Sequence, residues 1–167
     1  MNNLLGAIIA LVSVFSASVA PLPTQPDPLT VALQSFLDEK GSPMPAVELV
    51  KYSNWPMIVA VSCAESGYGK YVAGENNAWG IKDFRAGSVN YRGYRDFTDW
   101  AESIKYTSEL LYKYDAEDGS PEPKAMVRRW KYIAPFGGWL GTVNYSLHDI
   151  QDNVIAIVAD TDNQPSS

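Results

Sequence analysis

The chain has 167 residues, 46% hydrophobic and 12% aromatic, which suits one domain with a sizeable core and excludes a disordered chain. Thirteen basic and nineteen acidic residues give a net charge of -6, which disfavours nucleic acid as a partner. A single Cys and a single His exclude a disulfide within the chain and a closed Cys/His zinc site.

The N-terminal segment, residues 1–20, predicts export. It has no charged side chain between residues 4 and 20 and ends in small residues, as a secretory signal does. The absence of Lys or Arg before the apolar run and the proline at position 21 are atypical of a cleaved signal. Because the stretch is near the lower length limit for spanning a bilayer, an uncleaved membrane anchor is the alternative. Either interpretation places the rest of the chain in the periplasm, in the cell envelope or outside the cell.

Proline and helix-capping residues organise the next part of the chain. Four of the eight residues 21–28 are proline, which predicts a stiff, extended linker. A folded domain is expected over residues 29–160, followed by a polar tail, 161–167. Asp27 as N-cap and Pro28 as first residue predict a helix that ends at Gly41.

Two helices are expected next. A short helix over residues 45–52 leads to a buried one, for which Ser53 or Asn54 is the N-cap and Pro56 lies in the first turn.

Glu65 ends this buried helix. Ile58, Val61 and Glu65 follow a spacing that places them on one helix face, and Gly67 stops the helix. Because burial disfavours the charged form of a carboxyl group, such a position suits a general acid. A structural alternative is a carboxylate that caps the helix or pairs with Lys70.

A mixed polar and aromatic segment follows at residues 76–81. Asn76, Asn77, Trp79 and Gly80 combine amides, an indole and a glycine within six positions. A plain turn needs Asn and Gly but not Trp, whereas a sugar is bound by hydrogen bonds and ring stacking. The segment is therefore a candidate for sugar binding.

Residues 79–97 are expected to form a small β-hairpin. A turn at residues 86–88 precedes the extended pattern of residues 89–95. Tyr91 and Tyr94 lie in this pattern, either to stack on sugar rings or to pack in the core.

The remaining segments read mainly as packing elements. A helix capped by Thr98 or Asp99 carries an apolar stripe to Tyr114, and Glu102 suits a capping box at its start. Another helix begins at residues 120–121, an aromatic and glycine-rich loop covers residues 132–139, and a long apolar stripe predicts a core helix from residue 143 to 158. A surface or structurally satisfied role is expected for His148.

Four motifs together resemble the glucosaminidase family of peptidoglycan hydrolases, which includes the flagellar rod-associated domain and many autolysins. The resemblance spans residues 45–157, and its motifs are residues 65–70, 76–82, 91–97 and 102–104. It implies an α+β, mainly helical, lysozyme-like fold in which the hairpin forms one wall of the substrate groove.

The resemblance also implies a function. The substrate would be a peptidoglycan glycan strand, cut at the β-1,4 bond between N-acetylglucosamine and N-acetylmuramic acid by a monomer that needs no metal or other cofactor. Glu65 would be the general acid, and Tyr132 would face it across the groove. Substrate-binding positions would be Ser66, Asn76, Asn77, Trp79, Gly80, Tyr91 and Tyr94.

A second carboxylate, which glycosidases normally use, is missing from its family position. That position holds Asn90 or Tyr91, and Glu75 and Asp83 are the remaining candidates. The alternatives are therefore assistance by the N-acetyl group of the substrate, a lytic transglycosylase, or a non-catalytic protein of wall binding or assembly. A chitin or glycoprotein hydrolase on the same fold is a further alternative.

Overall fold

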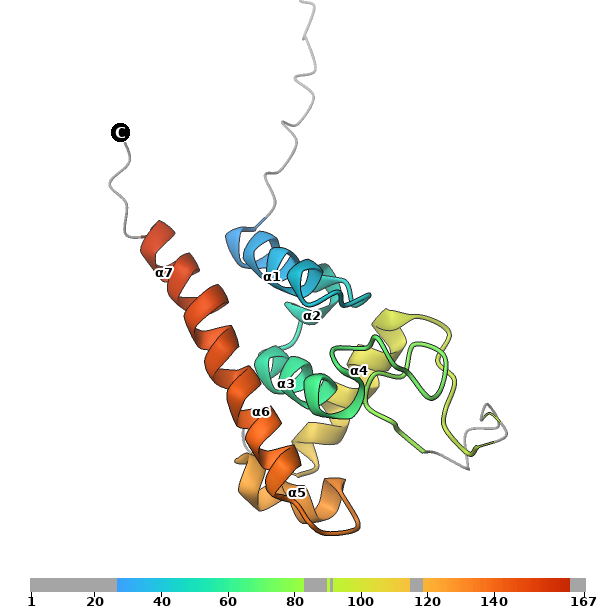
Figure 1. Cartoon of the computed structure of the whole chain (residues 1–167). Coiled ribbons are helices and arrows are strands. Elements are labelled where there is room, and N and C mark those ends of the chain that lie inside the picture. Colours follow the sequence, from blue (N-terminus) through green and yellow to red (C-terminus); the bar gives the residue numbers. More distant parts are fainter. Residues whose placement is uncertain (1–26, 83–89, 91, 115–118, 163–167) are drawn as a thin grey trace, which may run out of the picture.

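The structure is a computed structural model that describes residues 27–82, 90, 92–114 and 119–162 (Figure 1). Strands are absent from these residues, so the mainly helical prediction is confirmed and the α+β class with its β-hairpin lobe is wrong. The helical elements are α1 (Pro28–Glu39), α2 (Ala46–Leu49), α3 (Trp55–Ser66), α4 (Trp100–Tyr112), α5 (Pro123–Trp130), α6 (Gly137–Ile150), the π-helical η1 (Gln151–Ile155) and α7 (Ala156–Asp162).

Local signals set the ends of the helices as predicted. The Asp27 carboxylate accepts the N–H of Thr30 at 3.1 Å and caps α1. Gly67 adopts φ +60° and ends α3, because a residue without Cβ enters the left-handed region at low cost. Asp99 caps α4 by accepting the N–H of Glu102 at 2.8 Å.

Asn54 occupies the N-cap position of α3, but its side chain does not cap the helix. The buried amide instead donates to the carbonyls of Ser108 and Gly119, at 3.2 and 3.1 Å, and accepts from the Ser108 hydroxyl at 2.8 Å. Asn54 therefore ties the start of α3 to the end of α4 and to the segment that follows it.

Helix α3 lies at the centre of the fold. It packs against α6 and α4, and four consecutive residues, Ile58, Val59, Ala60 and Val61, are fully buried. A helix that is apolar on every face needs such enclosure. In Figure 1, α6, η1 and α7 continue one another as a long rod along one side, and α1 packs against α2 and η1. Glu65 lies in the last turn of α3, where the helix leaves the core.

The predicted apolar stripe of α4 is confirmed, and that of residues 143–158 is confirmed as far as Val154 but wrong at Ile157, which is 52% exposed. Helix α4 and the rod formed by α6 and η1 each turn one row of side chains into the core, and the fully buried members are Ile104, Thr107, Leu111, Val143, Ile150 and Val154. His148 lies on the exposed side of α6, as expected of a surface histidine. Helix α5 begins two residues later than the predicted start, and α6 begins within the predicted loop, at Gly137.

Asparagine side chains bond the backbone in the described part of the predicted hairpin. A backbone hydrogen bond of 2.9 Å joins the Arg95 N–H to the Ile81 carbonyl. The Asn77 amide bonds these same two residues, and the Asn90 side chain accepts the N–H of Arg92 at 2.9 Å. Backbone groups that a strand ladder would use are thus taken by local side chains. Residues 83–89 and 91 of the predicted hairpin lie outside the described residues.

Glu102 forms a variant of the predicted capping box. Its carboxylate accepts the backbone N–H of Thr98 at 2.9 Å and the guanidinium of Arg95 at 2.8 Å. The Thr98 N–H bond, with the Arg95 contact in addition, lowers the pKa of Glu102 below its ordinary value of 4.5.

A pH-dependent stability difference follows for Glu102→Gln. A lowered pKa in the folded state stabilises the fold above pH 4.5, and this contribution is lost as the pH falls through the folded-state pKa. The unfolding free energy of Glu102→Gln should therefore lie below that of the wild type at pH 7, and the gap should close in acid. Urea unfolding between neutral and acidic pH measures it. Glu109→Gln, on the exposed side of α4, is the control, and a gap that is the same at every pH contradicts the prediction.

The predicted signal or anchor lies outside the described residues, as do linker residues 21–26 and tail residues 163–167. Among the residues that the structure describes, none of the helices combines the length and apolar character needed to cross a bilayer.

Candidate functional site

The Glu65 carboxylate is the point at which three helices meet. It is half-buried at the end of α3, and its Oε1 accepts the indole N–H of Trp139 at 2.7 Å and that of Trp130 at 3.0 Å. Trp130 is the last residue of α5, and Trp139 lies in the first turn of α6. Because an indole N–H can only donate, the two rings and the carboxylate satisfy one another.

The second carboxylate oxygen, Oε2, has a different environment. Within the described residues no donor is assigned to it, and it faces Gly80. A Cβ placed on Gly80 would lie 4.0 Å from Oε2. Gly80 adopts φ +63°, a conformation that other residues rarely adopt, so the position favours glycine.

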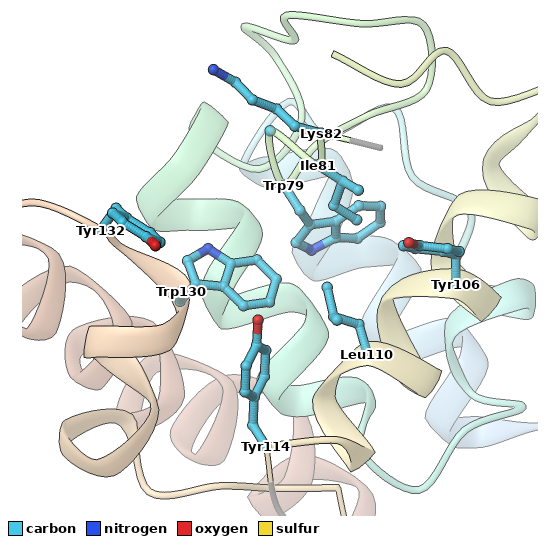
Figure 2. Close-up of a pocket in the computed structure, with 9 residues that line it drawn as sticks. Trp79, Ile81, Lys82, Tyr106, Leu110, Tyr114, Trp130 and Tyr132 are labelled. Carbon is cyan, nitrogen blue, oxygen red and sulfur yellow. The ribbon is translucent and has the colours of Figure 1, made fainter. Parts of the chain in front are cut away.

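An aromatic pocket of about 720 Å³ adjoins this carboxylate (Figure 2). Trp130, which donates to the Glu65 carboxyl group, and Gly80, which lies on its Oε2 side, are part of the pocket wall. Figure 2 shows Trp130 between Tyr132 and Tyr114, with Trp79 and Tyr106 on the other side. The lining is completed by Ile81, Lys82 and Leu110. Such flat aromatic faces with few polar groups suit a sugar ring.

Two of the lining side chains add polar character. Lys82 is exposed at the pocket, with its ammonium 4.7 Å from the ring centre of half-buried Tyr94. Tyr114 contacts the Trp130 ring edge to face at 6.0 Å, and burial raises the pKa of its phenol. The Tyr114 hydroxyl therefore stays protonated at neutral pH and can both donate and accept hydrogen bonds.

The predicted residues Trp79 and Tyr132 lie in the pocket wall. Trp79 is only 2% exposed, and its indole N–H donates to the Ile58 carbonyl at 2.9 Å, which fixes the ring on α3. Tyr132 is 96% exposed on the connection between α5 and α6, and the structure assigns it no hydrogen bond to Glu65. Trp79 thus belongs to the floor of the pocket and Tyr132 to its rim.

Ser66 and Asn76, predicted to bind substrate, use their polar atoms within the loop. The Ser66 hydroxyl donates to the Ala78 carbonyl at 2.6 Å and accepts the N–H of Gly69 at 2.9 Å. The Asn76 amide donates to the Phe97 carbonyl at 3.0 Å. These side chains hold the loop against α3.

Asn77 is fully buried, and its side chain makes three hydrogen bonds. Its amide nitrogen donates to the carbonyls of Ile81 and Arg95, at 2.9 and 2.8 Å, and its oxygen accepts the Ile81 N–H at 2.9 Å. Trp79 and Gly80 lie between Asn77 and its partner Ile81. Asn77 therefore positions the pocket residues instead of facing the pocket itself.

Three candidates from the sequence remain: Tyr91, Asp83 and Glu75. Tyr91 and the candidate carboxylate Asp83 lie outside the described residues, and Glu75 is exposed. No carboxylate is among the described residues that line the pocket. A group of three or more His, Cys, Asp or Glu side chains able to hold a metal ion is also not found in the described part of the chain.

Trp130, Trp139, Tyr106 and Tyr114 belong to the site but were not among the site residues predicted from the sequence. The two tryptophans reach Glu65 from 65 and 74 positions away in the sequence, beyond any local pattern. One usable signal was chemical: a buried indole N–H needs an acceptor, and Glu65 was a buried acceptor without an assigned donor.

Comparison of the chain with protein-family models, with curated proteins and with solved structures gave no match.

Proposed function

We propose that this protein cleaves the β-1,4 bond between N-acetylglucosamine and N-acetylmuramic acid in peptidoglycan, with Glu65 as the general acid. The observation that carries the proposal is the placement of one carboxyl group, held by two indoles, at the edge of an aromatic pocket. The motif resemblance of residues 65–70 and 76–82 supports the same activity. The lysozyme-like fold and the exported location are parts of this proposal.

The reaction begins with transfer of the Glu65 proton to the glycosidic oxygen. The O–H bond of the carboxyl group breaks, a new O–H bond forms on the leaving oxygen, and the electron pair of the C1–O bond moves to that oxygen. The sugar that remains has oxocarbenium character. Water completes hydrolysis by adding to C1 and returning a proton to the Glu65 carboxylate.

The lack of a carboxylate in the described lining favours two variants of this reaction. In one, the oxygen of the substrate's N-acetyl group attacks C1 and water opens the resulting ring. In the other, a lytic transglycosylase, a hydroxyl of the same sugar attacks C1 and gives its proton to Glu65, so that no water is consumed. Neither variant needs a second carboxylate as nucleophile.

Mass spectrometry of fragments released from purified cell wall tests the proposal. We expect soluble muropeptides, and their new ends identify the reaction: reducing glucosamine, reducing muramic acid or anhydro-muramic acid. Protein that binds the wall but releases no fragment would contradict the enzymatic proposal and support the wall-binding alternative. Chitin oligomers, incubated in parallel, test the alternative substrate.

A further inference from the structure

The two oxygens of the Glu65 carboxyl group are not equivalent. Oε1 accepts two indole N–H groups, whereas Oε2 has no assigned donor within the described residues and faces Gly80. An oxygen with both lone pairs occupied by N–H donors has no place for a proton. In the acid form of Glu65, the proton therefore lies on Oε2.

We propose that Trp130 and Trp139 are positioning residues that make Oε2 the oxygen that delivers the proton. This inference rests on the proposed function. The two rings approach from α5 and α6 and occupy Oε1, so Oε2, on the Gly80 side of the carboxyl group, is the oxygen left for the proton. A free glutamate side chain would exchange its two oxygens by rotation, and the two N–H bonds oppose that rotation.

The indoles also favour the transfer itself. Once the proton has left Oε2, the carboxylate is negative, and hydrogen bonds to an ionised acceptor are stronger than those to a neutral one. Trp130 and Trp139 therefore bind Glu65 more tightly in the transition state than in the ground state. An interaction of this kind raises kcat with little effect on substrate affinity.

The two tryptophans differ in their relation to the pocket. Trp139 is buried, with 5% of its surface exposed, and it is not part of the lining. Trp130 is half-buried and forms part of the wall. Removal of the Trp139 indole should therefore change kcat alone, whereas removal of the Trp130 indole should change both kcat and KM.

Steady-state kinetics on soluble glycan fragments test this difference. Trp139→Phe should lower kcat roughly tenfold or more, since loss of one preorganised donor is costly, and should leave KM within about twofold. Trp130→Phe should lower kcat and raise KM. Trp55→Phe, a buried tryptophan at the start of α3, is the matched control and should keep both values. A folded Trp139→Phe with unchanged kcat would overturn the inference.

A spectroscopic experiment checks the contact without activity. The chain has five tryptophans, so its ¹H–¹⁵N spectrum should show five indole signals, two of which are assigned by their absence in Trp130→Phe and Trp139→Phe. Glu65→Gln should shift those two signals upfield, because a neutral amide is a weaker acceptor than a carboxylate. The other three should not move. If neither assigned signal responds, the positioning contact does not exist in solution and the inference is wrong.

Failure of the proposed function and failure of the positioning role give different results. If Glu65→Gln shifts the two indole signals but the wild-type protein releases nothing from the wall, the proposed function is wrong and, with it, proton delivery by Oε2. If the wild-type protein cleaves the wall but Glu65→Gln shifts neither indole signal, or the kcat of Trp139→Phe is unchanged, only the positioning role is wrong.

Discussion

Glu65→Gln is expected to lower the rate of peptidoglycan cleavage by roughly 10²- to 10⁴-fold, the contribution typical of a general acid. The amide has the size and shape of the carboxyl group but cannot give up a proton to the leaving oxygen. Its oxygen can still accept the N–H groups of Trp130 and Trp139, so the fold should persist. Release of soluble fragments from purified wall measures the effect.

Matched measurements make this result specific to the carboxyl group. Glu109→Gln, which removes an exposed carboxylate on α4, should cleave at the wild-type rate. Co-sedimentation with the wall should show that Glu65→Gln still binds. Cleavage that is unchanged in folded Glu65→Gln would remove the mechanistic assignment.

Asn77→Ala is expected to destabilise the fold by about 2 kcal/mol or more. The substitution removes the side-chain partner of the Arg95 carbonyl and of the Ile81 N–H, whereas the Ile81 carbonyl keeps the Arg95 N–H, and each buried unsatisfied group costs about 1–3 kcal/mol. A loss of this size is a large fraction of the 5–15 kcal/mol typical of a domain. Urea unfolding, followed by circular dichroism, measures it.

Asn144→Ala is the control for this loss. Asn144 is exposed on α6, and exposed substitutions of this kind change the unfolding free energy by about 0.5 kcal/mol or less. An equally small change for Asn77→Ala would mean that the loop keeps its conformation without the amide, and that Asn77 is available for the predicted substrate contact instead.

Helix ends were predictable because their causes are local. The Asp27 cap, the left-handed Gly67 and the Asp99 cap each depend on residues within one turn of the helix end. The burial of α3 was predictable for a similar reason, since its apolar run leaves no face for water. A general acid at Glu65 was proposed from the same local evidence and remains a prediction.

The loop and the site depend on contacts that a local pattern does not record. Alternation of residue types favoured strands between residues 79 and 97, but it gives no weight to the Asn77 and Asn90 side chains that bond the backbone there. The donors to Glu65 come from two later helices, and their own segments read as packing or loop. Only the folded chain brings these indoles to the carboxyl group.

The two indoles also determine the orientation of the amide group in Glu65→Gln. Since neither ring can accept a hydrogen bond, the Glu65→Gln side chain is forced to turn its oxygen toward Trp130 and Trp139 and its NH₂ toward Gly80. That NH₂ can donate to the glycosidic oxygen without releasing a proton to it. If Glu65 is the general acid of the proposed reaction, the variant would hold an uncut glycan and would suit crystallisation of the complex before bond cleavage.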